Sequence, residues 1–236
     1  LINFDTSGSQ VQIAKASIAV NGITADNKVY DGSQVAAMKL SNMQSSGIFA
    51  ADQGSVALNI SGTFDTKDVG DNKTVTIAGT TGGANGGNYF ITGQTSTTAN
   101  VTPATYTALN GSKTYDGTNQ FSNVTLTGVN GETFKVAQAT SDGVNVSTHP
   151  QNAAKTFVQA EGVSEIAGSL GKTSNYKSLE LSQLTSNQAN VTPADFKSIT
   201  GTKDFDGSTS FQQAQVTGVN NETFTTSANA NSKNAS

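Results

Sequence analysis

A six-residue string, Ala-Asn-Val-Thr-Pro-Ala, occurs twice in this chain, at residues 99–104 and again 90 residues later at 189–194. Residues 101–134 and 191–224 align without a gap, and 16 of the 34 positions are identical. Self-similarity at this period indicates a series of like domains, since each copy carries its own set of turns and apolar runs. The repeat therefore argues against one large fold built around a single active site.

A second marker, an aromatic residue followed by Asp-Gly, divides the chain further. It occurs three times, at Tyr30-Asp31-Gly32, Tyr115-Asp116-Gly117 and Phe205-Asp206-Gly207. We predict the end of a preceding repeat or a linker at 1–10, a first copy at 11–100, a second at 101–190 and a truncated third at 191–236. A copy of about 90 residues can bury a modest core. Because the third copy is cut short, we expect the chain to be a stretch of a longer protein.

The composition favours β-structure and excludes several classes of protein. Hydrophobic residues make up 34% of the chain and charged residues 13%, and Val, Ile and Thr are plentiful. β-Branched residues favour strands, and a net charge of −4 is too small for a typical disordered chain. No basic stripe is present to bind nucleic acid, and no apolar run is long enough to insert into a membrane. The absence of cysteine excludes disulfides and thiolate metal sites.

Short apolar runs separated by turn signals predict the strands. In the second copy we expect strands over 105–109, 113–115 and 123–129, with tight turns at Asn110-Gly111 and Asn130-Gly131. In the first copy, residues 56–60 and 74–77 alternate between apolar and polar positions. Many short strands of this kind indicate a sandwich or a barrel.

Two tyrosines refine the expected fold. Tyr89 and Tyr176 each follow a turn-rich segment at the start of a late strand, as in the tyrosine corner of immunoglobulin-like sandwiches. We therefore predict an all-β chain of tandem small antiparallel β-sandwich modules, immunoglobulin-like, in an elongated array. The alternative is a β-grasp-like module with one short helix against a sheet. Helix signals are confined to a turn or two at 33–43 and a single turn at 164–168.

The order of these motifs resembles a known family. The matching segments of the first copy are Lys28–Gly32, Lys67–Gly70, Lys73–Ile77, Asn88-Tyr89 and Val101–Ala104, and those of the second copy are Lys113–Gly117 and Asn175-Tyr176. Together they resemble the YDG-type repeat domains found in large bacterial filamentous, haemagglutinin-like adhesins. The resemblance implies a stalk module of an exported adhesin and does not imply a defined ligand.

We therefore expect structural stalk or spacer repeats of a large secreted or surface-anchored bacterial adhesin. Such repeats would present binding regions away from the cell for adhesion or biofilm formation. The expected partners are the neighbouring repeats of the same chain and host-surface or matrix glycans and proteins. Two whole copies contain no catalytic constellation, so we expect no enzyme, no catalytic residues and no cofactor.

An alternative function is that each copy is itself a carbohydrate- or mucin-binding module. Asn88, Tyr89, Asn175 and Tyr176 would then supply hydrogen bonds and a face on which a sugar ring could stack.

The three aromatic-Asp-Gly triplets are interpreted as structural signatures. We expect the rings of Tyr30, Tyr115 and Phe205 to pack in the core, since phenylalanine keeps the packing while losing the hydroxyl. The Asp-Gly pairs, Asp31-Gly32, Asp116-Gly117 and Asp206-Gly207, would supply turns with a positive φ at glycine.

A calcium site is a weak hypothesis. Asp65, Asp68 and Asp71 could supply the oxygen ligands that calcium prefers, with Asp31 as a further candidate. Their spacing matches no EF-hand, which favours a solvated loop. His149 is the single histidine, so a histidine metal cluster or a recurring catalytic triad is excluded.

Overall fold

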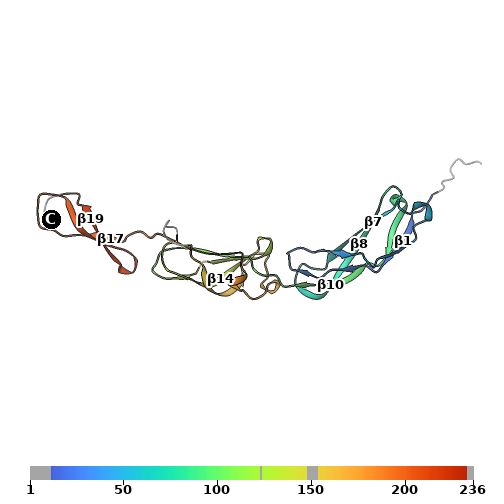
Figure 1. Cartoon of the computed structure of the whole chain (residues 1–236), viewed down its shortest axis with the longest axis horizontal. Coiled ribbons are helices and arrows are strands. Elements are labelled where there is room, and N and C mark those ends of the chain that lie inside the picture. The colour runs from blue at the N-terminus through green and yellow to red at the C-terminus, as the bar shows by residue number, and fades with distance from the viewer. Residues whose placement is uncertain (1–11, 123, 148–153, 233–236) are drawn as a thin grey trace, which may run out of the picture. The chain divides into compact units, whose positions relative to one another are not determined.

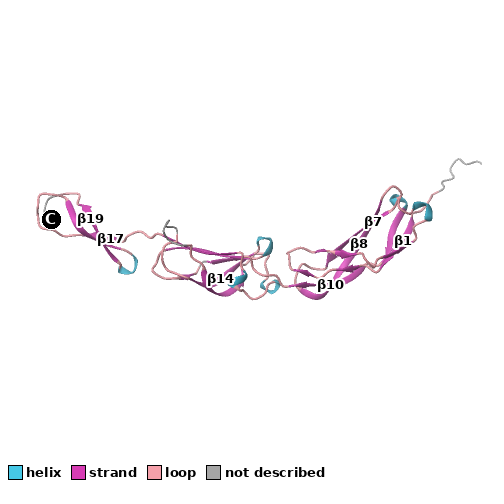
Figure 2. Ribbon diagram, viewed as in Figure 1, coloured by secondary structure: helices cyan, strands magenta, loops and turns pink. Residues whose placement is uncertain are grey.

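A computed structural model of the chain describes residues 12–122, 124–147 and 154–232 (Figure 1). In these ranges the fold is all-β, with strands joined by loops and by six 3-10 helices of a single turn (Figure 2). Within the described ranges there is no α-helix, and no helix has the length and apolar character needed to cross a bilayer. The chain divides into two compact units, unit 1 at residues 1–104 and unit 2 at residues 105–236. His149 lies outside the described residues.

Unit 1 contains the first copy. Its strands are β1 (Ala16–Asn21), β2 (Thr24–Ala25), β3 (Lys28–Val29), β4 (Val35–Ala36), β5 (Met38–Lys39), β6 (Gln44–Ser46), β7 (Ala57–Phe64), β8 (Gly70–Gly82), β9 (Tyr89–Gly93) and β10 (Ser96–Thr102). Its 3-10 helices are η1 (Ala50–Asp52) and η2 (Gly86–Asn88). The strands form a sheet of order β6-β1-β9, a sheet of order β3-β10-β8-β7-β4 and the pair β2-β5.

The core of unit 1 joins its two larger sheets. Ile18 and Val20 of β1 and Tyr89 of β9 are buried, and they pack against Leu58 and Ile60 of β7. The alternation predicted over residues 56–60 is confirmed, because the apolar side chains of β7 turn inward while their neighbours are exposed. Each sheet thus contributes one apolar face to a shared interior.

Unit 2 contains the second copy and the third. Its strands are β11 (Ala108–Thr114), β12 (Gln120–Phe121), β13 (Val124–Thr127), β14 (Thr133–Ser141), β15 (Phe157–Glu165), β16 (Ser186–Thr192), β17 (Ser198–Thr200), β18 (Ser210–Thr217) and β19 (Thr223–Asn229). Its 3-10 helices are η3 (Val129–Gly131), η4 (Thr173–Asn175), η5 (Leu181–Gln183) and η6 (Val219–Asn221). The second copy forms a six-stranded sheet of order β12-β14-β13-β11-β16, in which β15 also pairs with β14. The third copy forms a separate sheet, β17-β18-β19.

Three strand pairs correct the expected antiparallel arrangement. β1 runs parallel to β9, β3 parallel to β10, and β11 parallel to β16. In each case a strand early in a copy lies beside one of its last strands. Parallel neighbours need a long connection, and the rest of the copy provides it.

The predicted turn at Asn110-Gly111 is wrong, because β11 runs through both residues. Gly111 pairs with Val124 of β13 on one side and with Ala189 of β16 on the other. A Cβ at Gly111 would lie 2.9 Å from Cζ of Phe157, so the glycine makes room for that ring. The dipeptide thus serves packing between distant segments, which overrides its local turn preference.

One further turn prediction is confirmed, and the two predictions of helical turns are wrong. The turn at Asn130-Gly131 is confirmed, with φ of 51° and 71°. The helical turns expected at 33–43 and 164–168 are wrong, because residues 35–36 and 38–39 are strands and 164–165 end β15. The helix required by the β-grasp alternative is therefore not found in the described part of the chain.

Candidate functional site

Each aromatic-Asp-Gly triplet is held by a lysine two residues before its aromatic ring. In the second copy, Lys113 Nζ lies 2.7 Å from Asp116 Oδ1 and donates to the carbonyl and hydroxyl oxygens of Thr118 at 2.7 and 2.8 Å. It also donates to the carbonyl oxygen of Gln120 at 2.9 Å. We call this arrangement of one ammonium and four oxygens the lysine clasp.

The lysine clasp is repeated in all three copies. Its ion pairs are Lys28–Asp31 at 2.8 Å, Lys113–Asp116 at 2.7 Å and Lys203–Asp206 at 2.7 Å. In each copy the aspartate also accepts from the backbone N–H two residues on, which closes an Asx turn. The glycine of each triplet has a φ of 77° or 78°, as predicted from Asp-Gly. An ammonium surrounded by carbonyl, hydroxyl and carboxylate oxygens fixes the loop.

An aromatic ring completes each clasp, and its place in the chain varies. Lys113 lies 5.0 Å from the ring centre of Phe121, and Lys203 lies 5.3 Å from that of the equivalent Phe211. In the first copy Lys28 lies 5.4 Å from Phe64, which is on a different strand. A cation–π contact is thus present in every copy, although its ring comes from two positions.

This exchange of rings involves three buried positions. Phe64 and Ser141 are equivalent, because their N–H groups donate to the equivalent carbonyls of Gln34 and Asn119. The buried set is Ala36, Phe64 and Val75 in the first copy, and Phe121, Ser141 and Phe157 in the second. The first copy fills this set with one ring, Phe64, whereas the second copy fills it with two rings, Phe121 and Phe157, beside the small Ser141. Different side-chain combinations thus fill the same three positions of a closely packed interior.

The clasps lower the pKa of their aspartates. For Asp31 and Asp116, partial burial acts to raise the pKa, but hydrogen bonds from lysine, Ser33 and Thr118 outweigh it. For Asp206, the hydrogen bond from Lys203 is the largest cause and lowers the pKa to about 2. The three carboxylates are therefore charged well below neutral pH, and they act as structural anions.

The late tyrosines bind carboxylates on a turn far back in the sequence. Tyr89 donates to Asp52 Oδ2 at 2.5 Å, and Tyr176 donates to Glu132 Oε2 at 2.7 Å. Each hydroxyl also accepts a backbone N–H, from Phe49 in the first copy and from Val129 in the second. The pKa of Tyr89 is raised by its hydrogen bond to Asp52. These contacts differ from a tyrosine corner, whose hydroxyl bonds to backbone a few residues upstream.

Burial overturns the stacking role considered for these tyrosines. Tyr89 and Tyr176 are 2% and 7% exposed, and Asn175 is buried as well. Neither ring offers a free face to a sugar, and of the four residues considered Asn88 alone is exposed. Instead, Tyr89 at the start of β9 bonds to Asp52 of η1, and Tyr176 directly after η4 bonds to Glu132.

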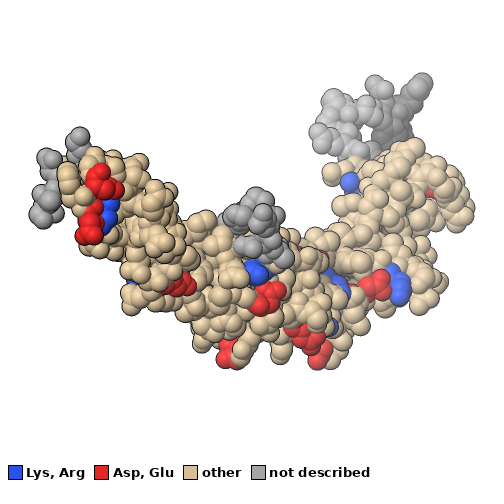
Figure 3. Space-filling view, turned by 60° about the vertical axis from the view of Figure 1, so that its left-hand side comes forward, with Lys and Arg blue, Asp and Glu red and all other residues tan. Residues whose placement is uncertain are grey.

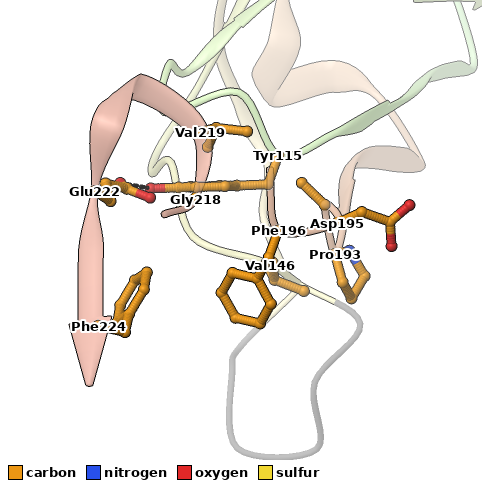
Figure 4. A pocket seen from close by; sticks show the side chains of 10 residues that line it. Tyr115, Val146, Pro193, Asp195, Phe196, Gly218, Val219, Glu222 and Phe224 are labelled. Carbon is orange, nitrogen blue, oxygen red and sulfur yellow. Dashed lines mark hydrogen bonds between the residues drawn. The ribbon is translucent and has the colours of Figure 1, made fainter. Parts of the chain in front are cut away.

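The triplet of the second copy contacts the third copy within unit 2. Tyr115 donates to Glu222 Oε1 at 2.6 Å (Figure 4). Asn220 Nδ2 donates to the carbonyl oxygen of Asp116 at 2.8 Å. The hydrogen bond to Glu222 is the main cause of a raised pKa for Tyr115. We call this pair of contacts the junction. Both of the residues that the third copy contributes lie on the turn at 219–222.

The positions of the triplet rings correct part of the prediction. Tyr30 is buried, whereas Tyr115 lies against the third copy and Phe205 is 73% exposed. Core packing is therefore not the shared role of the three rings. What they share is a loop geometry set by lysine, aspartate and glycine.

The calcium candidates do not assemble. Asp65 pairs with Lys73 Nζ at 2.7 Å, and the hydrogen bond from Lys73 is the main cause of its lowered pKa. Among the residues that the structure describes, no three His, Cys, Asp or Glu side chains are grouped to hold a metal ion, so Asp68 and Asp71 complete no such site. On the face seen in Figure 3, acidic and basic side chains are scattered in small groups over a largely uncharged surface.

The sequence prediction missed the clasp lysines and the carboxylates that bind tyrosine. A signal for the lysines was present, because Lys28, Lys113 and Lys203 all precede the aromatic residue by two positions. Glu132 and Glu222 also stand at the same place in their copies. Asp52 could not be found this way, since the second copy has no close match to the segment around it.

The comparisons with known proteins identify one domain. Residues 14–99 match the family model of the YDG domain, so the chain contains a YDG domain there. This result confirms the YDG domain that was predicted for the first copy. No curated protein and no solved structure matches the chain.

Proposed function

We propose that this chain is a stretch of stalk from a large secreted or surface-anchored bacterial adhesin. Its copies would be immunoglobulin-like sandwiches linked in series, which hold a binding region away from the cell for adhesion or biofilm formation. The YDG domain at 14–99 and the repetition of its signature residues at 113–118 and 203–208 support this role. Weak contacts repeated along such a series gain strength through avidity.

The junction is the observation that carries the proposal. A spacer must limit bending between its copies, and this requires contacts between one copy and the next. Tyr115 and Asp116 of the second copy bond directly to Glu222 and Asn220 of the third. The hydrogen bond between Tyr115 and Glu222 involves a charged acceptor, which makes it stronger than a neutral one.

The geometry of the triplet suits this task. The lysine clasp fixes the loop, so the carbonyl of Asp116 and the ring of Tyr115 are already in place when the third copy docks. Fixing a loop before contact reduces the entropy lost on association. The same residues therefore serve the fold of one copy and its connection to the next.

Small-angle scattering of the full chain tests the spacer role. A compact chain of this length would have a radius of gyration of about 18 Å. We expect a clearly larger value and a profile typical of an elongated particle. A value near that of the compact chain would contradict the proposal. Immunogold electron microscopy of the source cells, with antibodies to this chain, should label the cell surface.

A polar hollow supports a second candidate function, carbohydrate binding. It lies on β12, β14 and β15 and is lined by Gln120, Gln138, Thr140, Gln159 and Glu161. Gln138 Nε2 donates to Gln120 Oε1 at 2.7 Å, and Gln159 Nε2 donates to Glu161 Oε1 at 2.5 Å. Amide and carboxylate groups are donors and acceptors of the kind that sugar hydroxyls bind.

A glycan array separates the two functions. Saturable binding that is lost in a Gln138→Ala, Glu161→Ala variant would support carbohydrate binding at the hollow. Binding that survives this double substitution would place the sugar elsewhere. Silence across the array, together with an elongated scattering profile, would favour the spacer alone.

A further inference from the structure

The polar hollow on β12, β14 and β15 has a volume of about 100 Å³, which is room for a few water molecules. The strand register brings its side chains together. Gln138 lies directly opposite Glu161, and Thr140 lies between Gln120 on one neighbouring strand and Gln159 on the other. All five side chains share one face of the sheet, because opposed residues and residues two apart point the same way.

The other copies show that the fold does not require these side chains. The same strand register in the first copy places at the equivalent positions Val35, Ser61, Thr63, Thr76 and Ala78. None of these carries an amide or a charge. In the third copy, Ser210 and Ala228 stand where the second copy has Gln120 and Gln138. The amide and carboxylate groups of the hollow are therefore specific to the second copy.

The hydrogen bonds within the hollow leave acceptor oxygens over. Gln120 Oε1 accepts from Gln138 Nε2 at 2.7 Å and from Thr140 Oγ1 at 3.3 Å. Glu161 Oε1 accepts from Gln159 Nε2 at 2.5 Å. Within the described ranges, no residue donates to Glu161 Oε2 or to the amide oxygens of Gln138 and Gln159, and no lysine pairs with Glu161. The hollow thus combines an unpaired negative charge with a surplus of acceptors.

The lysine clasp shows which group such a set of oxygens binds. Each clasp binds an ammonium group through a carboxylate, a hydroxyl and two carbonyl oxygens. The hollow contains the same kinds of oxygen, from the carboxylate of Glu161, the hydroxyl of Thr140 and the amides of its glutamines. An ammonium group has three donors and no acceptor, which suits a surplus of acceptors. Calcium takes more oxygens, commonly from several carboxylates, and the hollow has one carboxylate.

The lining also distinguishes between ligands that carry an ammonium group. A lysine side chain has a long apolar stem, which packs along apolar surface, and every residue that lines the hollow is polar. In an amino sugar, the nitrogen is attached to a ring that bears hydroxyls on the neighbouring carbons. The amides of Gln138 and Gln159 can both donate to and accept from such hydroxyls. The hollow therefore fits an amino sugar better than a lysine.

We propose that the hollow binds the ammonium group of an amino sugar, a glycan unit whose nitrogen is not acetylated. This inference rests on the carbohydrate-binding function and names its ligand class. The ammonium group donates to Glu161 and to the amide oxygens, while hydroxyls of the same sugar bond to the glutamines. Acetylation of the nitrogen removes its charge and leaves a single donor, so the acetylated sugar binds poorly.

The test titrates a glucosamine oligosaccharide, and its fully N-acetylated form of equal length, into the full chain by isothermal calorimetry. At mildly acidic pH the amines carry protons. We expect saturable binding of the glucosamine form and binding of the acetylated form that is weaker by about tenfold or more, because a hydrogen bond between charged groups is lost.

Glu161→Gln should weaken binding of the glucosamine form to a similar degree, because it removes the charge and keeps the size of the side chain. Glu180→Gln is the matched control. Glu180 also accepts from a glutamine amide at 2.5 Å, that of Gln183, and it lies outside the hollow. Its substitution should leave binding unchanged. Thermal unfolding checks that both variants are folded.

The outcomes separate this proposal from the function on which it rests. Equal binding of the two oligosaccharides, or undiminished binding by Glu161→Gln, would overturn the amino-sugar assignment. If that binding were still lost in the Gln138→Ala, Glu161→Ala variant, the hollow would remain a carbohydrate site. Equally tight binding of a short oligolysine peptide would also overturn the assignment, since the sugar would then add nothing. Absence of binding by any glycan up to about 1 mM would refute both the assignment and the carbohydrate function.

Discussion

The hydroxyl of Tyr115 donates to Oε1 of Glu222 at 2.6 Å, across 107 residues of sequence. One residue further on, the carbonyl of Asp116 accepts from Asn220. The triplet of one copy and a turn of the next are thus joined by two hydrogen bonds. The triplet therefore connects successive copies, which is a role that a single copy cannot have.

Tyr115→Phe should loosen the junction without unfolding either copy. The ring is kept while the bond to the charged acceptor is lost, as in the natural Phe205. Limited proteolysis should cleave the segment 193–197 several-fold faster. Tyr89→Phe is the matched control, because it removes a tyrosine–carboxylate bond inside the first copy. Equal cleavage of the parent and of Tyr115→Phe would show that the junction does not restrain this segment.

Glu222→Gln should lower the pKa of Tyr115. The hydrogen bond to the glutamate is the main cause that raises this pKa above 10.0. A group with a raised pKa stabilises the folded form below its unfolded pKa and loses that effect as pH rises through the folded value. The junction should therefore loosen in alkali, and the Gln variant should not share this dependence. Carbon-13 NMR of labelled tyrosine measures the shift directly.

Lys113→Met should destabilise the second copy by about 2 kcal/mol, because several oxygens lose a common donor. The lysine side chain is only 14% exposed, so water replaces it poorly. Lys39→Met is the control: Lys39 and its partner Asp26 are both more than half exposed, and its loss should cost less than about 0.5 kcal/mol. Urea unfolding compares the two, and equal effects would contradict the clasp.

Gly111→Ala should cost about 1–3 kcal/mol, because the added methyl crowds a packed core. Its Cβ would lie 2.9 Å from Phe157 and 3.1 Å from Val124. Gly87→Ala serves as the control, since nothing lies within 4 Å of that Cβ and its φ is not positive. Thermal unfolding measures both variants.

Gly128→Ala and Gly218→Ala should differ, although the two glycines are equivalent. The first should cost about 3 kcal/mol, because its Cβ overlaps the ring of Tyr176. The second should change the stability of the free chain by no more than about 0.5 kcal/mol. Thermal unfolding of both variants gives the comparison. If both were equally destabilising, the space over Gly218, where a Cβ would meet Phe224 at 3.4 Å, would be smaller in solution than in the structure.

Acid should weaken all three copies, because each depends on a charged clasp aspartate. The clasp aspartates have lowered pKa values, and that of Asp206 is about 2 against an ordinary 3.8. A carboxyl with a depressed pKa contributes stability above its unfolded pKa, and this is lost as pH falls through the folded value. The unfolding temperature should therefore fall between about pH 4 and pH 2. A variant with all three aspartates changed to Asn should show a flatter profile.

Much of the fold follows from local pattern, and the errors have a common cause. The alternation at Leu58 and Ile60 and the turn at Asn130-Gly131 depend on neighbouring residues, and both predictions were confirmed. Asn110-Gly111 reads as a turn locally, but the ring of Phe157 needs the space over the glycine. The parallel strand pairs and the turn carboxylates likewise depend on residues far apart in the sequence.

The candidate site was only partly predictable. The positive φ of Gly32, Gly117 and Gly207 was foreseen from their sequence. The exposure of Phe205 and the contact of Tyr115 with Glu222 were not, because they depend on which segment lies beyond each loop.

The exchange of Ala36, Phe64 and Val75 for Phe121, Ser141 and Phe157 limits how such a repeat can evolve. A crossover inside a copy would join Phe121 to Phe64, or Ala36 to Ser141, and these are combinations that neither copy packs together. A crossover in the shared string at 99–104 and 189–194 leaves the set of buried residues of each copy unchanged. Identical strings at the boundaries would thus let the number of copies rise or fall by whole copies, while the interior of each copy diverges separately.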